Sequence, residues 1–232
     1  MTTTIHVLSA GAAKGLVRAL QPDFKRVNDV RFECQFGAVG AMHDRLIAGD
    51  DCDLIVLSAA MLARLVDEGR VAADTVTKIG DVETGIAVPA GSPKPRVDNA
   101  DALRSALNNA RRIYLPDPEK ATAGIHFANV LKQLGIYESV RERLEPHPNG
   151  ATAMRAMADS RDDHLIGCTQ ITEINYTEGV RLVGALPPEF SLKTTYAVGV
   201  CIGSSQPELA RAFAASLGGP ESAELRRQGG FL

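Results

Sequence analysis

The sequence predicts an α/β protein of two lobes joined by hinge strands. Residues 1–71 alternate strand and helix patterns, which is typical of a parallel sheet with helices on both faces. Two later strand patterns, "TGIAVPA" and "TTYAVGVCI", stand apart from this alternation. The chain has 232 residues and 45% hydrophobic content, which is enough for one core or for two smaller ones.

The first half begins with the strand pattern "TIHVLSA", followed by a helix pattern with apolar residues at helical spacing. Pro22 lies inside this pattern and is expected to interrupt or end the helix. Strands are then predicted in "VRFECQF" and "CDLIVLSA", the latter buried on both faces. Helices are predicted in "GAVGAMHDRLIAGD" and "AMLARLVDEGRV", each closed by a glycine.

The second half predicts strands in "RRIYLPD" and "HLIGCTQ". Helices are predicted in "ADALRSALNNA", "TAGIHFANVLKQLG" and "GATAMRAMADS", with two more near the end of the chain. If "TGIAVPA" and "TTYAVGVCI" cross between lobes, the first lobe contains residues 1–83 plus 196–232 and the second contains 84–195. We expect a ligand cleft between the lobes, where α/β folds place their ligands.

Composition excludes several classes of function. The net charge is −3 and basic pairs are isolated, so the chain lacks a nucleic-acid footprint. The four cysteines show no zinc spacing and are interpreted as buried free thiols; neither a metal nor a cofactor is expected. No signal-peptide pattern or apolar run of membrane length is visible, so we expect a cytoplasmic protein without membrane insertion, or a periplasmic one if a signal was removed.

Two loops of the first lobe are candidates for anion binding. In "SAGAAKG", Gly11 and Ala12 let backbone N–H groups approach a ligand at the positive end of the next helix. Lys14 either meets an anion there or is solvated. In "FGAVGAMHDR", Gly37 begins a turn with the same geometry, and His43 is either a ligand or a packing residue.

Two loops of the second lobe complete the candidate set. Thr122 is expected to cap a helix in which Ala123 and Gly124 leave the N–H groups unobstructed. His126, one turn in, is a ligand donor, an acid/base group or a core residue with a backbone partner.

In "GCTQITEI", Thr169 and Gln170 follow a buried strand, and Gln170 is suited to donate to a carboxylate or oxyanion. Glu173 is more simply explained as a brace for the following loop. Tyr196 is placed for a phenolic hydrogen bond across the hinge.

These segments resemble the molybdate-binding family of bacterial periplasmic solute-binding proteins. The resemblance runs from "IHVLSAGAAKGLV" through "FGAVGAMHDRLIAGDDCDLIVLSA" and "PDPEKATAGIHFANVLKQLG" to "TYAVGV". It implies a type II periplasmic-binding-protein fold, a small anionic ligand and, for an exported protein, an ABC transporter permease as partner. The implied ligand-binding residues are Gly11, Ala12, Lys14, Gly37, Ala38, Val39, Ala123, Gly124, His126, Thr169, Gln170 and Tyr196.

The resemblance is incomplete at the oxyanion site. Where the family usually has serines, this chain has Ala12, Ala38 and Val39. A buried oxyanion would lose charge-assisted hydrogen bonds, each contributing about 1.5–3 kcal/mol. We therefore expect an organic carboxylate rather than molybdate as the ligand.

The chain is most similar to a divergent branch near which one known activity is the cofactor-independent isomerisation of aconitate, a 1,3-proton shift. That reaction needs a base, an anion clamp and exclusion of water. For the isomerase alternative, His126, His43 or Glu173 is the expected base, and Lys14 is expected to form part of the clamp.

Overall fold

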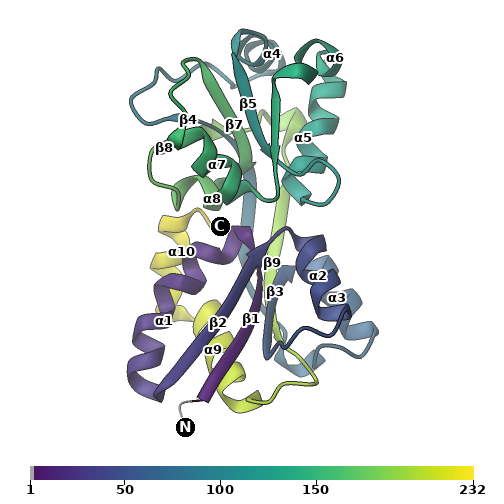
Figure 1. Ribbon diagram of the computed structural model, residues 1–232, viewed down its shortest axis with the longest axis vertical. Coiled ribbons are helices and arrows are strands. Elements are labelled where there is room, and N and C mark those ends of the chain that lie inside the picture. Colours follow the sequence, from purple (N-terminus) through teal and green to yellow (C-terminus); the bar gives the residue numbers. More distant parts are fainter. Residues whose placement is uncertain (1–2) are drawn as a thin grey trace. The chain divides into compact units, whose positions relative to one another are not determined.

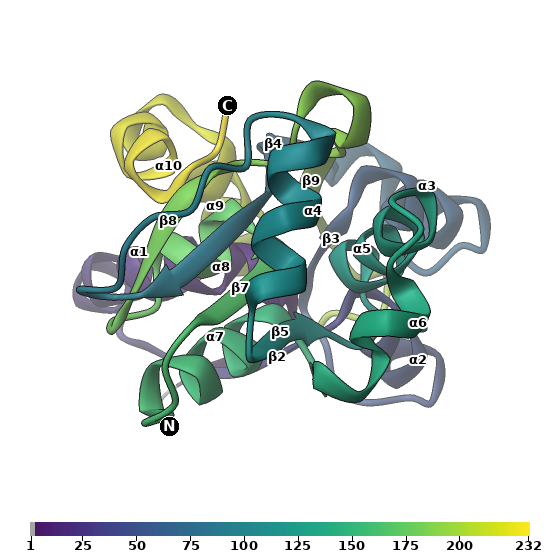
Figure 2. The same cartoon turned by 90° about the horizontal axis from the view of Figure 1, so that it is seen from above.

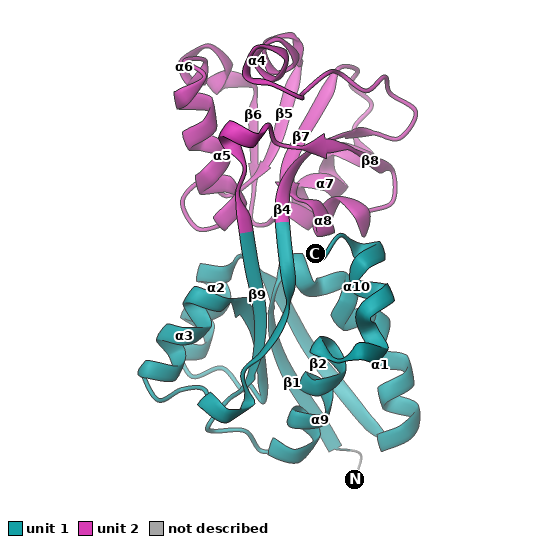
Figure 3. Ribbon diagram, turned by 180° about the vertical axis from the view of Figure 1, so that it is seen from behind, with its two compact units in different colours: residues 1–82, 194–232 teal, residues 83–193 magenta. Residues whose placement is uncertain are grey.

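The computed structural model describes residues 3–232, which form two compact units (Figure 3). Unit 1 runs to Val82 and resumes at Thr194, and unit 2 is the continuous stretch Glu83–Lys193. The chain passes between the units inside β4 (Thr77–Pro89) and inside β9 (Lys193–Val200). The segments "TGIAVPA" and "TTYAVGVCI", which the sequence analysis set apart, overlap β4 and β9.

Unit 1 contains three strands besides its portions of β4 and β9, and helices on both faces. Its other strands are β1 (Thr3–Ala10), β2 (Val30–Gly37) and β3 (Leu54–Ser58). Its helices are α1 (Lys14–Asn28), α2 (Val39–Ile47), α3 (Ala59–Asp67), α9 (Pro207–Gly218) and α10 (Ala223–Gly229), with short 3₁₀ turns at Gly11–Ala13, Ala73–Thr75 and Pro220–Ser222.

The sheet of unit 1 has the strand order β2-β1-β3-β9. Strand β1 is parallel to β2 and β3, as predicted, whereas β9 is antiparallel to β3. Helices α2 and α3 lie on one side of these strands, and α1 and α9 lie on the other (Figure 1). Because both faces are covered, all four residues Leu54–Leu57 of β3 are fully buried, which confirms the reading of "CDLIVLSA" as a doubly buried strand.

Helix α1 continues through Pro22, so the expected interruption at this residue is wrong. Proline removes one backbone donor from the helix, but tertiary packing holds the last turns in place. The Phe24 ring centroid lies 5.0 Å from that of Phe213 in α9 and 5.8 Å from that of Phe32 in β2. Three elements thus converge on an aromatic cluster just beyond the proline.

Unit 2 contains the rest of β4, four further strands and five helices. The strands are β5 (Arg112–Pro116), β6 (Leu144–His147), β7 (Leu165–Gln170) and β8 (Val180–Ala185). The helices are α4 (Ala100–Asn109), α5 (Thr122–Gln133), α6 (Tyr137–Val140), α7 (Gly150–Asp159) and α8 (Ile171–Asn175), with 3₁₀ turns at Arg141–Arg143 and Pro188–Phe190.

The strands of unit 2 follow the order β6-β5-β7-β4-β8. Alternate residues of one strand enter two different cores, because successive side chains of a strand point to opposite faces. Ile113 and Leu115 pack with α4 and α5, whereas Tyr114 between them packs with α7. Figure 2 shows α7 and α5 on opposite sides of β5 and β7. Unit 2 is therefore also an α/β layer structure with two covered faces.

Within residues 3–232, no helix combines the length and apolar character that crossing a membrane requires.

Candidate functional site

The carboxyl ends of the strands in unit 1 bring together the candidate residues of the first two loops. Ala10, the last residue of β1, pairs with Gly37, the last residue of β2. The turn Gly11–Ala13 follows Ala10 directly, and helix α2 begins at Val39, one residue beyond Ala38, which follows Gly37. At the end of β3, Ser58 pairs with Tyr196 of β9. We call this edge the unit 1 set: Gly11, Ala12, Lys14, Gly37, Ala38, Val39, Ser58 and Tyr196.

The helices that start at this edge have no side-chain caps. The residues preceding α1, α2 and α3 are Ala13, Ala38 and Ser58, and none of their side chains bonds the first turn. By contrast, Asn99 and Asn149 cap α4 and α7 with side-chain oxygens. The first N–H groups of a helix have no partner inside it, and that end carries partial positive charge. The unit 1 set can therefore donate backbone hydrogen bonds to an anion.

Two cations flank the aromatic ring next to this edge. The Lys14 Nζ lies 5.9 Å from the ring centroid of Phe36, and the Arg18 guanidinium carbon lies 5.3 Å from it. Phe36 is half-buried and directly precedes Gly37. Both cations lie within cation–π range of this ring, so positive charge gathers beside the small apolar residues Gly37, Ala38 and Val39.

His43 lies in α2 and has one nitrogen that the protein does not use. Its Nδ1 is 3.1 Å from the Asp44 carboxylate. Its Nε2 is buried and has no hydrogen-bond partner among residues 3–232. A buried polar atom in this state is unusual and indicates either strain or a missing ligand.

In unit 2, the third loop forms a tight strand-to-helix turn. The Asp117 carboxylate accepts hydrogen bonds from the N–H groups of Glu119 (2.7 Å) and Lys120 (3.1 Å). Thr122 is the first residue of α5, after Ala121, and forms no side-chain cap, so the expected Thr122 cap is wrong. The turn itself positions the helix start, and its N–H groups remain uncapped by side chains.

Gly124 is required by packing against the strand end. A Cβ at this position would overlap the carbonyl oxygens of Pro116 and Asp117. Ala123 beside it is buried. The small residues of "TAGIH" therefore allow α5 to pack closely against the end of β5.

Gln170 ends β7 and pairs with Thr84 of β4. Their exposed fractions are 2% and 1%. The Thr84 Oγ1 has no hydrogen-bond partner within the described residues. Sequence reasoning missed Thr84, although a polar residue directly before the apolar run "GIAVP" is a usable signal. We call Thr84, Ala123, Gly124 and Gln170 the unit 2 set.

Thr169 and Glu173 bond to each other and do not complete this set. The Thr169 hydroxyl donates to Glu173 Oε2 (2.5 Å), and the Ala151 N–H donates to Oε1 (3.3 Å). The Glu173 carboxylate thus occupies the positive end of α7. Burial raises the pKa of Glu173, and these hydrogen bonds offset that rise only in part. The sequence analysis favoured a brace for the loop that follows Glu173; the carboxylate instead braces the start of α7, which precedes it in the chain.

His126 has the backbone partner that was one of its three expected alternatives. Its Nε2 lies 2.7 Å from the carbonyl oxygen of Phe190. Since a carbonyl oxygen only accepts, Nε2 carries the proton and donates it there. His126 thereby ties α5 to the loop before β9.

The architecture of two α/β units agrees with the comparisons to known proteins. Residues 5–232 match the family of bacterial extracellular solute-binding proteins, and the chain belongs to this family. Its fold is the type II periplasmic-binding-protein fold that the sequence predicted.

The chain is similar to two known proteins in sequence and to one solved structure in fold. The chain is 27% identical to an aconitate isomerase from Pseudomonas sp over 240 residues, covering 99% of this chain and 87% of the relative. It is 24% identical to the molybdate-binding protein ModA of Escherichia coli (strain K12) over 231 residues, covering 98% and 88%. The periplasmic molybdate-binding protein of Azotobacter vinelandii superposes with a TM-score of 0.80 at 16% identity, covering 98% of each chain. These matches confirm the expected resemblance to the molybdate-binding type.

Proposed function

We propose that this solute-binding protein binds a small organic di- or tricarboxylate. The observation that carries the proposal is the chemistry of the unit 1 set. Ala12, Ala38 and Val39 stand where molybdate binders usually have serines, so the hydroxyl donors that surround a tetrahedral oxyanion are missing. Each lost charge-assisted hydrogen bond would weaken oxyanion binding by about 1.5–3 kcal/mol.

The remaining donors suit carboxylates better. Lys14 and Arg18 supply positive charge at the edge of unit 1, and uncapped helix starts supply backbone N–H groups. Ala12, Ala38 and Val39 are small and apolar, which suits contact with the carbon skeleton of an organic acid. In unit 2, the Gln170 amide and the Thr84 hydroxyl are proposed as groups that can hydrogen-bond a carboxylate.

An exported protein of this family would deliver its ligand to an ABC transporter permease, and we propose this partner and a periplasmic location for the chain. The family description as extracellular supports this proposal.

A second candidate function is isomerisation of a polycarboxylate by a 1,3-proton shift. Two observations favour it: the 27% identity to an aconitate isomerase across 99% of the chain, and the unpartnered Nε2 of His43. His43 would remove a proton from one carbon of an allylic carboxylate and return it to the carbon two positions away. His126 and Glu173 are weaker candidates for this base, since His126 Nε2 and the Glu173 carboxylate already have protein partners.

Two experiments on the same set of ligands test both candidates. Isothermal titration calorimetry would compare citrate, cis- and trans-aconitate and tricarballylate with molybdate, tungstate and sulfate. Proton NMR in deuterated water would follow the same acids with catalytic amounts of protein. Carboxylate binding without product peaks supports a binding protein, and deuterium incorporation that His43→Asn abolishes supports the isomerase. Preference for the inorganic oxyanions would contradict both.

The first prediction concerns Lys14. Lys14→Ala is expected to weaken carboxylate binding at least tenfold, because it removes a charged donor from the unit 1 set. Lys25→Ala is the matched control: Lys25 also lies on α1, and its Nζ is also 5.9 Å from a phenylalanine ring, that of Phe32. Calorimetry should find the control unchanged. Equal affinities for the two variants would make Lys14 a solvated lysine.

A further inference from the structure

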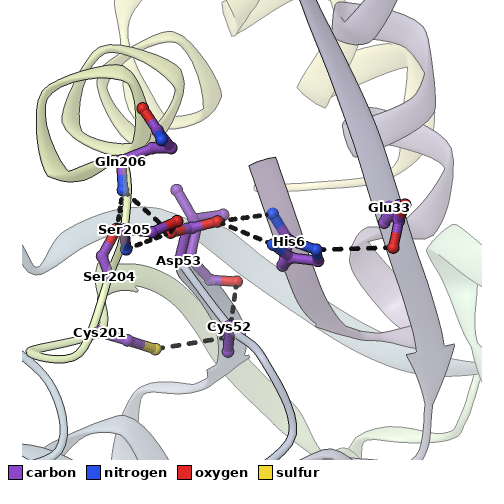
Figure 4. Close-up of polar contacts among 9 residues, drawn as sticks. His6, Glu33, Cys52, Asp53, Cys201, Ser204, Ser205 and Gln206 are labelled. Carbon is purple, nitrogen blue, oxygen red and sulfur yellow. Dashed lines mark hydrogen bonds and ion pairs between the residues drawn. The ribbon is translucent and has the colours of Figure 1, made fainter. Parts of the chain in front are cut away.

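Two thiols meet at the end of the unit 1 sheet that is opposite to the unit 1 set. Cys52 lies just before β3, and Cys201 lies just after β9, which runs antiparallel to β3. The two Sγ atoms are 3.4 Å apart, in hydrogen-bonding contact (Figure 4). Cys52 is half-buried and Cys201 is buried.

The surrounding backbone is fixed by hydrogen bonds. The Cys201 N–H donates to the Asp53 carbonyl (3.0 Å), and the Ile202 N–H donates to the Arg70 carbonyl (2.9 Å). The Asp53 carboxylate also accepts from the hydroxyl of Ser204 (2.7 Å) and the N–H of Ser205 (2.8 Å). Figure 4 shows these groups converging on Asp53 beside the thiol pair. The two sulfur atoms are therefore held close together by the fold.

We propose that Cys52 and Cys201 form a reversible intramolecular disulfide when the protein meets a small-molecule disulfide such as oxidised glutathione. This proposal is independent of the proposed ligand. The sulfur atoms must approach from 3.4 Å to a bond length of about 2.05 Å, which requires the two side chains to rotate toward each other. The sequence separation of 149 residues is no obstacle, since the fold already joins the two strands.

The order of the two exchange steps follows from exposure. Cys52, the accessible thiol, loses its proton to solvent, and its thiolate attacks one sulfur of the small disulfide, releasing one small thiolate. Cys201 then loses its proton and attacks Cys52 Sγ, releasing the second small thiolate. The protein loses two protons and two electrons, and one small disulfide becomes two thiols. The hydrogen bond with Cys52, together with burial, raises the pKa of Cys201, so Cys201 is the resolving and not the first attacking thiol.

The other two cysteines are poor competitors. Burial raises the pKa of Cys34 to about 11, although its sulfur accepts a hydrogen bond from the Gln21 amide (2.9 Å). Cys168 is fully buried within the core of unit 2, and burial raises its pKa well above the usual value. All four cysteines are free, as expected, but only Cys168 and Cys201 are buried, whereas Cys34 and Cys52 are half-buried.

The test uses the full chain in glutathione buffers that range from fully reduced to mostly oxidised. Samples would be quenched with acid, alkylated with N-ethylmaleimide, and analysed by intact mass and peptide mapping. Variants are Cys34→Ser with Cys168→Ala, which keeps only the pair, and Cys52→Ala and Cys201→Ala, which each remove one partner. Thermal unfolding of oxidised and reduced protein provides a second measurement that does not depend on any variant.

The proposal expects the oxidised wild-type chain to lose two alkylation sites and to yield a peptide linking Cys52 to Cys201. Its Tm should rise by several degrees over that of the reduced protein, because the cross-link restricts the unfolded chain. Cys201→Ala should stop at a mixed disulfide on Cys52. Full alkylation across the series, a lasting mixed disulfide on wild-type Cys52, or a different cysteine pairing would overturn the proposal.

Discussion

At the scale of single residues, the buried carboxylates of Asp53 and Glu173 have pKa values that are shifted in opposite directions. Burial alone would raise the pKa of Asp53, but hydrogen bonds from the His6 N–H, the Ser204 hydroxyl and the Gln206 N–H together hold it below its usual value. For Glu173 burial prevails, and its pKa is raised. The two groups should therefore affect stability with opposite dependence on pH.

Glu173 should favour folding most at low pH. A raised pKa in the folded protein means that folding takes up a proton between the usual value of 4.5 and the higher folded value. The unfolding free energy of the wild type should fall as pH rises through this window. Glu173→Gln removes the titration, so its stability relative to wild type should improve from pH 4 to 8, by up to about 1.4 kcal/mol for each pH unit within this window.

Urea unfolding of both proteins at several pH values measures this trend. A difference between them that stays constant from pH 4 to 8 would contradict it.

Asp53 should show the reverse behaviour. Asp53→Asn removes a carboxylate that accepts hydrogen bonds from β1 and from the segment that starts α9, so the variant should be about 1.5–3 kcal/mol less stable at pH 7. The loss should be full above pH 3.8, the usual value, and should shrink as pH falls through the lower folded pKa.

Chemical denaturation from pH 2 to 7 would measure that loss. Glu33→Gln is its control, since the Glu33 side chain is 73% exposed although it also faces His6, at 3.5 Å. An equal loss in both variants would argue against a special role of the Asp53 network.

At the scale of elements, the strand-to-helix turn before α5 depends on Gly124. Gly124→Ala would place a methyl group on the carbonyl oxygens of Pro116 and Asp117, and backbone cannot rotate away as a side chain can. We expect a loss of at least about 2 kcal/mol in the unfolding free energy. Gly184→Ala in β8 should be tolerated, because its nearest neighbour would be the Val97 Cγ2 at 3.9 Å. Thermal or urea unfolding of both variants would measure these free energies. Comparable losses of unfolding free energy in Gly124→Ala and Gly184→Ala would contradict the packing argument.

The strands and helices differ in how well they could be predicted from the sequence. Strands buried on one or both faces and amphipathic helices have clear periodicity, so most of them were predicted, including β3 and α5. Strands β6 and β8 were missed because their residues are mainly half-buried and show no alternation. Helix α1 was predicted to break at Pro22, since the packing of Phe24 against Phe213 depends on residues far away in the sequence.

At the scale of the whole molecule, the fold class follows from the alternation of strand and helix patterns and from two strands that leave it. The candidate site could be predicted only in outline. Loops after parallel strands must gather at one edge, which places Gly11 near Gly37. The partners of Glu173 and His126 could not be predicted, because Ala151 and Phe190 meet them only through tertiary packing.

The interrupted course of unit 1 has a consequence for how the protein is made. On the ribosome, β1 to β3 emerge early, but β9, which covers the edge of β3, emerges only after the whole of unit 2. Until then β3 presents an open edge, which invites pairing with other chains. Unit 2 is continuous and can fold during this interval. Folding of unit 2 would shorten the effective loop between β3 and β9. Unit 1 begins to emerge first, but it can be completed only after unit 2 has been synthesised.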